Sequence, residues 1–198
     1  MNNYEYIVAS LPVISQDTRS SDGGPDFTSL VEWIRSQCSA SDNRLIDFLL
    51  QGYDDEGLNA AFYSKALSHK DEFLRQYFTL DLAIRNAKVR HINKALGRPL
   101  EQDIFMPSPD ESPLYDEVMA GEDILERERK IDDLLWKRID EVNVFKYFEM
   151  DRVLGFIAQL HIIDRWMKLD PETGKEMFRS LVSGVRGSFS GIQYEEKK

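Results

Sequence analysis

Apolar side chains recur every three or four residues along most of the chain, which is the spacing of one face of an α-helix. The clearest run covers residues 69–96, and Gly97 followed by Pro99 is typical of a helix end. The same periodicity predicts two more long helices, over residues 122–142 and 145–168, and it places Phe148 on the inward face of the second. These patterns predict an all-α fold, a bundle of long antiparallel helices.

Two shorter helices are expected before the first long one. Asp26 is a typical N-cap for a helix with a single apolar stripe, and Ser41 or Asp42 is expected to start a second, more apolar helix. Gly52 is expected to end that second helix in the left-handed conformation. Residues 58–67 then lead into the first long helix.

The two ends of the chain carry weaker patterns. Residues 4–11 fit a short helix that ends before Pro12 better than they fit the imperfect alternation of a strand. Asp170 and the proline after it predict the start of a last helix, which ends at Gly184. Residues 185–198 have too few apolar positions to pack and are expected to form a mobile tail.

Four of the seven prolines fall within residues 98–113, where they exclude a helix interior or a central strand. They predict a connection between an N-terminal helical half, residues 1–97, and a C-terminal half, residues 114–184. When the sequence is aligned with itself at an offset of 80 residues, the segment that begins at Asp71 matches the one that begins at Asp151, and 5 of 18 positions are identical. Either the halves are related by duplication, or two amphipathic helices share leucines and charges without common origin.

Composition limits the class of protein. Of 198 residues, 42% are hydrophobic and 11% aromatic, which predicts a folded chain rather than a disordered one. No apolar run approaches the roughly 20 residues of a membrane span, and the first residues do not resemble a secretory signal. The single cysteine, Cys38, excludes an internal disulfide. We therefore expect a cytoplasmic protein.

Charge is spread unevenly along the chain. The net charge of -10 argues against a general nucleic-acid binder, because phosphate binding needs a concentrated basic surface. Residues 101–141 hold 14 acidic and five basic side chains, whereas residues 70–98 hold seven basic and three acidic ones. Each run is either a solvated helix face with ion pairs, such as Glu126 with Lys130, or a surface that meets a partner.

Catalytic and metal-binding patterns are scarce. The histidines, at 69, 91 and 161, lack the helical spacing of a zinc or di-iron site. His161 and Asp164 would serve a small hydrolase as base and orienting carboxylate, but the apolar surroundings of His161 favour a packing role. Cys38 lies on an apolar stripe, and no phosphate-binding loop is present. We expect no enzymatic activity, cofactor, metal or small-molecule substrate.

Three short motifs stand out: Tyr4-x-Tyr6-x-x-Ala9, the segment Ile84-Arg85-Asn86-Ala87-Lys88-Val89-Arg90, and Phe156-Ile157-Ala158-Gln159-Leu160-His161-Ile162-Ile163-Asp164-Arg165. They resemble motifs of the central-stalk C subunit, also called d, of vacuolar- and archaeal-type rotary ATPases, which is an all-helical family. The segment Tyr4-x-Tyr6-Ile7-Val8-Ala9-Ser10-Leu11-Pro12 also resembles a family of uncharacterised bacterial proteins that are encoded with vacuolar-type ATPase subunits.

The resemblance implies a non-catalytic coupling subunit that links the rotating shaft of a vacuolar-type ATPase or ATP synthase to its membrane ring. Its partners would be the shaft and ring subunits, and it would be peripheral to the membrane through these proteins. The competing hypothesis is a free-standing acidic helical adaptor that binds a basic partner. The residues expected at interfaces, or in polar contacts between helices, are Tyr4, Tyr6, Arg85, Asn86, Arg90, Asp164 and Arg165.

Overall fold

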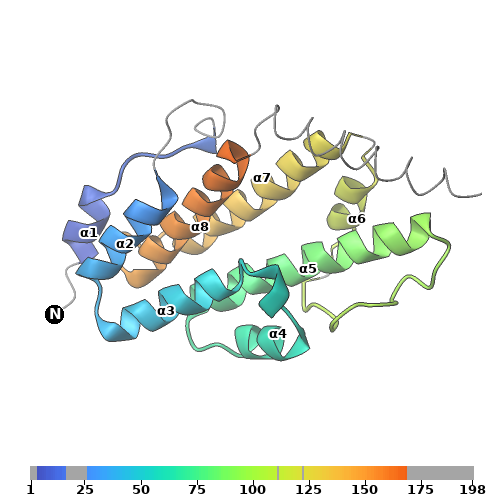
Figure 1. The fold of residues 1–198 in the computed structure, drawn as a ribbon, viewed down its shortest axis with the longest axis horizontal. Helices are drawn as coiled ribbons and strands as arrows, with labels where there is room; N and C mark the ends of the chain where they lie inside the picture. The colour runs from blue at the N-terminus through green and yellow to red at the C-terminus, as the bar shows by residue number, and fades with distance from the viewer. Residues whose placement is uncertain (1–3, 17–25, 111, 122, 169–198) are drawn as a thin grey trace, which may run out of the picture.

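The computed structural model describes residues 4–16, 26–110, 112–121 and 123–168. Within these ranges the chain forms eight α-helices and the short 3-10 helix η2 (Asp55–Gly57), with no β-strand (Figure 1). The all-α prediction is therefore confirmed. No helix in the described ranges combines the length and apolar character needed to cross a bilayer. The helix expected over residues 170–184 and the tail after it lie outside the described residues.

The first three helices are α1 (Tyr4–Ser10), α2 (Phe27–Gln37) and α3 (Ala40–Gln51). Asp26 caps α2 as predicted, because its carboxylate accepts a hydrogen bond from the backbone N–H of Ser29 at 2.9 Å. The predicted start of α3 at Ser41 or Asp42 is wrong. Ser39 is the N-cap, and its hydroxyl and the Asp42 carboxylate accept each other's backbone N–H in a capping box.

Gly52 ends α3, but not in the left-handed conformation that the sequence suggested. Its φ is -68°, which any residue adopts. A glycine is needed there for space instead, since a Cβ atom would lie 2.2 Å from Cε1 of Phe78. Gly97, by contrast, has a φ of 65° and does end its helix as predicted.

Two helices form the middle of the chain, α4 (Ala60–Leu67) and α5 (Glu72–Ala95). The long helix α5 begins three residues later than its apolar pattern indicated. Asp71 is the N-cap and accepts a hydrogen bond from the backbone N–H of Leu74 at 2.9 Å. The preceding residues, Ser68 to Lys70, form the turn between the two helices.

The last three described helices are α6 (Pro113–Met119), α7 (Ile124–Asn143) and α8 (Met150–Met167). The helix α6 was not predicted from the sequence; Ser112 is its N-cap, and Pro113 lies in its first turn. The predicted start of α8, at residue 145, is five residues too early. The backbone N–H of Lys146 instead donates to the carbonyl of Asn143 at 3.0 Å, so residues 144–149 form a turn.

The core centres on α8, which packs against α1, α2, α3, α5 and α7 and lies between α2 and α7 in Figure 1. The main apolar cluster contains residues from both sides of the proline-rich connection, among them Phe78 of α5 and Leu154 of α8. A smaller cluster joins α5, α6 and α7. The division into an N-terminal and a C-terminal half stays a prediction.

Polar side chains fix the proline-rich connection to the rest of the fold. The amide of Asn93 donates to the carbonyls of Leu100 and Gln102, at 3.1 and 2.7 Å. The hydroxyl of Ser108 donates to the carbonyl of Thr79 at 3.0 Å. The connection therefore lies along α5 rather than standing away from the body.

Candidate interaction surface

The predicted interface residues Arg85 and Asn86 are engaged within the chain. Arg85 donates hydrogen bonds at 3.1 Å to Asp81, on the same helix, and to Asp55 of η2. Asn86 is only 2% exposed, and its amide donates to the carbonyl of Met106 at 3.0 Å. Both side chains therefore hold α5 to neighbouring segments.

The basic face of α5 meets the acidic segment of the same chain. Arg90 pairs with Asp116 of α6 at 3.3 Å, and Lys88 pairs with Glu128 of α7 at 3.0 Å. The two oppositely charged runs seen in the sequence thus neutralise each other in part across helices. The predicted pair of Glu126 with Lys130 is also present, at 2.8 Å.

Arg165, on α8, is the centre of a polar cluster with α7. Its guanidinium donates to both carboxylate oxygens of Asp132, at 2.6 and 2.7 Å, and lies 3.6 Å from Glu128. The indole N–H of Trp166 donates to the same carboxylate. Asp164 pairs with Lys168 at 2.6 Å. Arg165 therefore joins two helices of the bundle.

The two amino-terminal tyrosines differ in their surroundings. The Tyr4 hydroxyl donates to the Asp42 carboxylate at 2.8 Å, which joins α1 to α3. Tyr6 is more than half exposed, and its ring lies 6.5 Å from that of Trp33. Tyr6 is therefore the more exposed of the two predicted tyrosines.

His161 lies in an aromatic stack. Its ring is parallel to that of Tyr53 with centroids 3.7 Å apart, and Phe27 meets it edge-on at 5.8 Å. Burial, together with the positive charge of Arg165, lowers the pKa of His161 to about 4. The imidazole is therefore neutral at pH 7 and packs as an aromatic ring.

Other candidate chemistry is limited in the part of the chain that the structure describes. No cluster of three or more histidine, cysteine or acidic side chains there is arranged to hold a metal ion. Cys38 is partly buried, and this burial raises the pKa of its thiol to about 11. A thiol with so high a pKa is protonated at neutral pH.

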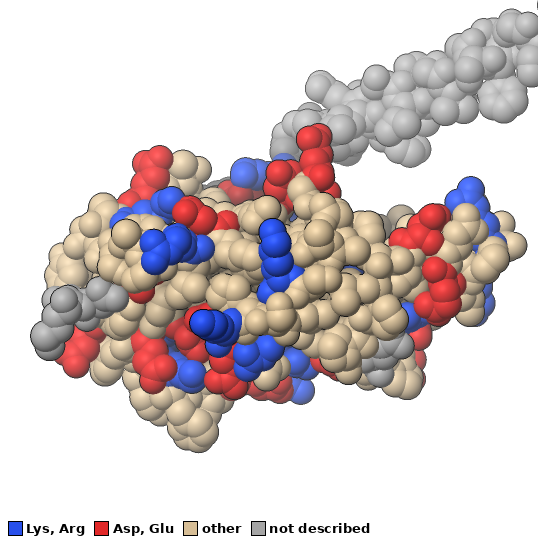
Figure 2. All heavy atoms as spheres, turned by 90° about the horizontal axis from the view of Figure 1, so that it is seen from below, with Lys and Arg blue, Asp and Glu red and all other residues tan. Residues whose placement is uncertain are grey.

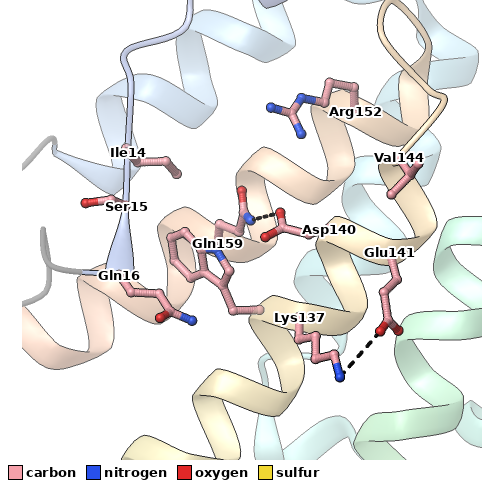
Figure 3. Close-up of a pocket in the computed structure, with 10 residues that line it drawn as sticks. Ile14, Ser15, Gln16, Lys137, Asp140, Glu141, Val144, Arg152 and Gln159 are labelled. Atoms are coloured by element: carbon pink, nitrogen blue, oxygen red, sulfur yellow. Dashed lines mark hydrogen bonds and ion pairs between the residues drawn. The ribbon is translucent and has the colours of Figure 1, made fainter.

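A hollow of about 680 Å³ lies between α7, α8 and the segment that follows α1. Figure 3 shows polar side chains on its walls, with the buried amide of Gln159 donating to Asp140 at 2.8 Å and Lys137 facing Glu141. Trp136 and Val144 add apolar surface. Acidic, basic and apolar groups are mixed, and this arrangement suits a protein surface better than a single small ligand.

The turn between α7 and α8 exposes large apolar side chains. We call the side chains of Val144, Phe145, Tyr147 and Phe148 the turn surface; they are 52%, 81%, 67% and 52% exposed. Exposed apolar side chains are ordinary when scattered, but four within five residues form a patch typical of an interaction site. The prediction that Phe148 faces inward is wrong, because the helix begins only at Met150 and Phe148 precedes it in the turn.

A second apolar hollow lies where α7 begins and α8 ends. It is formed by Ile124, Leu125 and Trp166, with Glu128 and Arg165 at its edge, and has a volume of about 430 Å³. Elsewhere charges of both signs are interspersed, as on the face that Figure 2 shows. The turn surface and this hollow are two apolar features of the described residues that a partner could cover.

Comparison with known families relates the C-terminal part of the chain to one of them. The model of a family described as a protein of unknown function, DUF2764, matches residues 114–188, a little over a third of the chain. The match includes α6 apart from its first residue, α7, α8 and the turn surface, and it extends beyond the described residues. No curated protein and no solved structure is significantly similar to the chain.

The turn surface was the feature that sequence reasoning missed. Its signal was present as Phe145-Lys146-Tyr147-Phe148, a run of bulky side chains on adjacent positions. A helix buries positions three or four apart, so adjacent aromatics do not fit one helical face. Such a run at the junction of two helical patterns is itself a reason to expect an exposed turn.

Proposed function

We propose that this chain is a non-catalytic subunit of a vacuolar-type rotary ATPase or ATP synthase. In this role it is the central-stalk coupling piece between the rotating shaft and the membrane ring. The proposal rests on the motifs at Tyr4 to Ala9, Ile84 to Arg90 and Phe156 to Arg165, which resemble the C subunit family. It assigns no reaction to the chain.

The observation that supports a binding role is the turn surface. A monomer gains nothing in stability from bulky apolar side chains held in water, whereas a partner that covers them gains the free energy of their burial, about 25 cal/mol per Å². The bundle behind the turn is cross-linked by ion pairs from α5 to α7 and from α7 to α8. Such a body suits a part that transmits force between two neighbours.

The proposal places the protein in the cytoplasm, on the membrane ring and beneath the shaft. It is tested by purifying tagged chain from its native membranes in mild detergent and identifying the bound proteins by mass spectrometry. Recovery of the nucleotide-binding, shaft and ring subunits in fixed proportion would support the role. Purification of the same complex through a tagged shaft subunit should recover this chain as well.

The contrary outcome is equally defined. Absence of every rotary ATPase subunit, in both directions of the purification, would reject the coupling role. The free-standing acidic adaptor would then be the better hypothesis, and the bound proteins should be basic. A tagged unrelated acidic helical protein, purified in the same way, controls for charge-driven retention.

A further inference from the structure

The turn surface is held in place by the side chain of Lys146 at its centre. The ammonium group pairs with Asp151 at 3.0 Å and lies 3.6 Å from both Glu72 and Glu149. These contacts tie the turn to the first turns of α5 and α8. The aromatic side chains therefore project from a fixed backbone, and a protein that covers them has little of this chain to order.

The charge beside the turn surface is balanced, although the whole chain has a net charge of -10. Two cations and two carboxylates line the hollow of about 680 Å³ beside Val144, namely Lys137, Arg152, Asp140 and Glu141. Two of each also line a hollow of about 360 Å³ beside Phe145, namely Arg138, Lys146, Glu72 and Glu141. A strongly charged protein of either sign is therefore not favoured here, whereas a second balanced surface meets little repulsion.

A carboxylate and a cation lie close together where α8 begins. Glu149 and Arg152 are three positions apart, about one helical turn, and both are exposed. Figure 3 shows the guanidinium of Arg152 without an ion pair to the other residues drawn. About a two-fold axis, residue i of one copy meets residue j of the other, and j meets i. Glu149 and Arg152 can therefore form two reciprocal ion pairs between two copies of this chain.

The turn surface has projecting rings with hollows beside them. Tyr147 is 67% exposed, and the hollows are those that Val144 and Phe145 line. Each hollow is larger than a cavity of about 150 Å³, which is enough to hold a benzene molecule. An interface between two identical surfaces needs projections and hollows on the same surface. The turn surface meets this requirement.

The area of the turn surface suits a weak dimer. A buried aromatic side chain covers roughly 200 Å², so the three rings, which are 81%, 67% and 52% exposed, offer about 400 Å² in each copy. Two copies would bury about 800 Å² from these rings alone. Val144 and the walls of the hollows bring the total to about 1,000 Å², the lower limit for a specific interface. We therefore expect a dissociation constant in the micromolar range.

We propose that two copies of this chain associate through their turn surfaces, about a two-fold axis. The aromatic side chains of one copy pack on those of the other and enter its hollows, and Arg152 of each copy meets Glu149 of the other. The inference goes beyond the proposed function, because it names what covers the turn surface of the isolated chain. It holds or fails independently of the coupling role.

The test is sedimentation equilibrium of the full chain at physiological salt, from about 1 µM to about 1 mM. We expect the average mass to rise from that of one chain towards that of two. Phe145→Ser with Tyr147→Ser should weaken the dimer at least about tenfold, as expected for the loss of two aromatic anchors. The matched control, Ile124→Ser with Leu125→Ser, removes two exposed apolar side chains at the start of α7 and should leave the affinity within about twofold.

Charge reversal tests the two-fold arrangement. Arg152→Glu alone and Glu149→Arg alone should each weaken the dimer about fivefold, because like charges then face each other twice. An equimolar mixture of the two variants should regain most of the wild-type affinity, since each reversed residue then meets its opposite. The controls Lys130→Glu and Glu126→Arg make the same changes of net charge on an exposed pair of α7 and, alone or mixed, should leave the affinity within about twofold. Circular dichroism confirms that each variant is folded.

The inference is overturned if the mass stays that of one chain at every concentration. Equal losses in the turn variant and its matched control would overturn it as well, and so would a charge-reversed mixture that associates no better than its components. These outcomes are separate from those of the membrane purification. A dimer with no rotary ATPase subunit recovered would reject the coupling role alone. A recovered ATPase complex with a monomeric purified chain would reject the dimer alone.

Discussion

The guanidinium of Arg165 donates to both carboxylate oxygens of Asp132, at 2.6 and 2.7 Å, and so joins α8 to α7. Asp132 is 1% exposed, whereas Arg165 is 40% exposed. The Asp132 carboxylate is thus the buried member of the pair, and the arginine compensates the cost of burying its negative charge. Trp166 donates to the same carboxylate from the next position of α8.

Removal of the arginine should therefore cost more than removal of the whole pair. We expect Arg165→Met to lower the free energy of unfolding by about 3 kcal/mol, since it leaves a buried carboxylate without its cation. The double variant Asp132→Leu with Arg165→Met should recover part of that loss. Urea denaturation measures both. Arg129→Met, which removes a cation 5.5 Å from the Trp166 ring, is the local control and should cost less than about 1 kcal/mol.

Reversal of charge at Arg85 should disturb the fold as well as any interface. The side chain joins Asp81 and Asp55, and the hydroxyl of Tyr63 donates to the same Asp81 carboxylate. Because Arg85 is one third exposed, solvent screens part of the effect. We expect Arg85→Glu to lower the free energy of unfolding by about 1 to 2 kcal/mol and Arg85→Lys to lower it by less. An unchanged melting temperature in Arg85→Glu would contradict this structural role.

Much of the fold was predictable because helices leave local signals in the sequence. Asp26 and Gly97 mark helix ends by chemistry that involves only their near neighbours. The misplaced ends depended on contacts that periodicity does not record. Gly52 is required by the ring of Phe78, 26 positions away in the chain, and α6 is too short to show a helical period.

The candidate surface was less predictable than the fold. The sequence alone does not distinguish a charged side chain that faces solvent from one that contacts a partner or another helix. It therefore did not show that Arg90 pairs with Asp116 or that Arg165 pairs with Asp132. These pairings need the tertiary arrangement of α5 to α8. The turn surface was missed for a different reason: the helical pattern was extended back to residue 145, and Phe148 was therefore taken as an inward residue of that helix.

The neutral, partly buried His161 should make stability depend on pH. Its pKa is about 4 in the folded chain against 6.5 for the ordinary side chain, so the unfolded chain binds more protons between these values. The free energy of unfolding should fall as the pH is lowered from about 6.5 towards 4, by up to roughly 3 kcal/mol from this group. Above pH 6.5 the imidazole is neutral in the folded and the unfolded chain, so His161 lowers the free energy of unfolding only below that pH.

The part of the pH dependence that is due to His161 is measured by comparing the wild type with His161→Phe. Phenylalanine keeps a ring against Tyr53 but has no proton to gain, so its stability should fall less between pH 7 and pH 4.5. His91→Gln lies outside the stack and should retain the wild-type dependence. Equal pH dependence in wild type and His161→Phe would show that the imidazole does not carry the effect.

Gly155 of α8 lies close against α7, and the effect of an alanine there should depend on the residue at position 143. A Cβ at Gly155 would lie 2.2 Å from Nδ2 of Asn143 and 3.1 Å from Cγ2 of Ile139. Gly155→Ala should therefore lower the free energy of unfolding by about 1 to 3 kcal/mol, although alanine at a helix interior is otherwise favourable by about 1 kcal/mol.

Asn143 supplies the background that tests this explanation. Its side-chain amide is buried, and neither its nitrogen nor its oxygen has a hydrogen-bond partner. Asn143→Ala removes the clashing group, so Gly155→Ala in that background should be neutral or stabilising. Thermal and urea unfolding of the four proteins give the coupling energy directly. Additive losses would mean that the helices cannot use the released space and that Ile139, not Asn143, sets the limit on their approach.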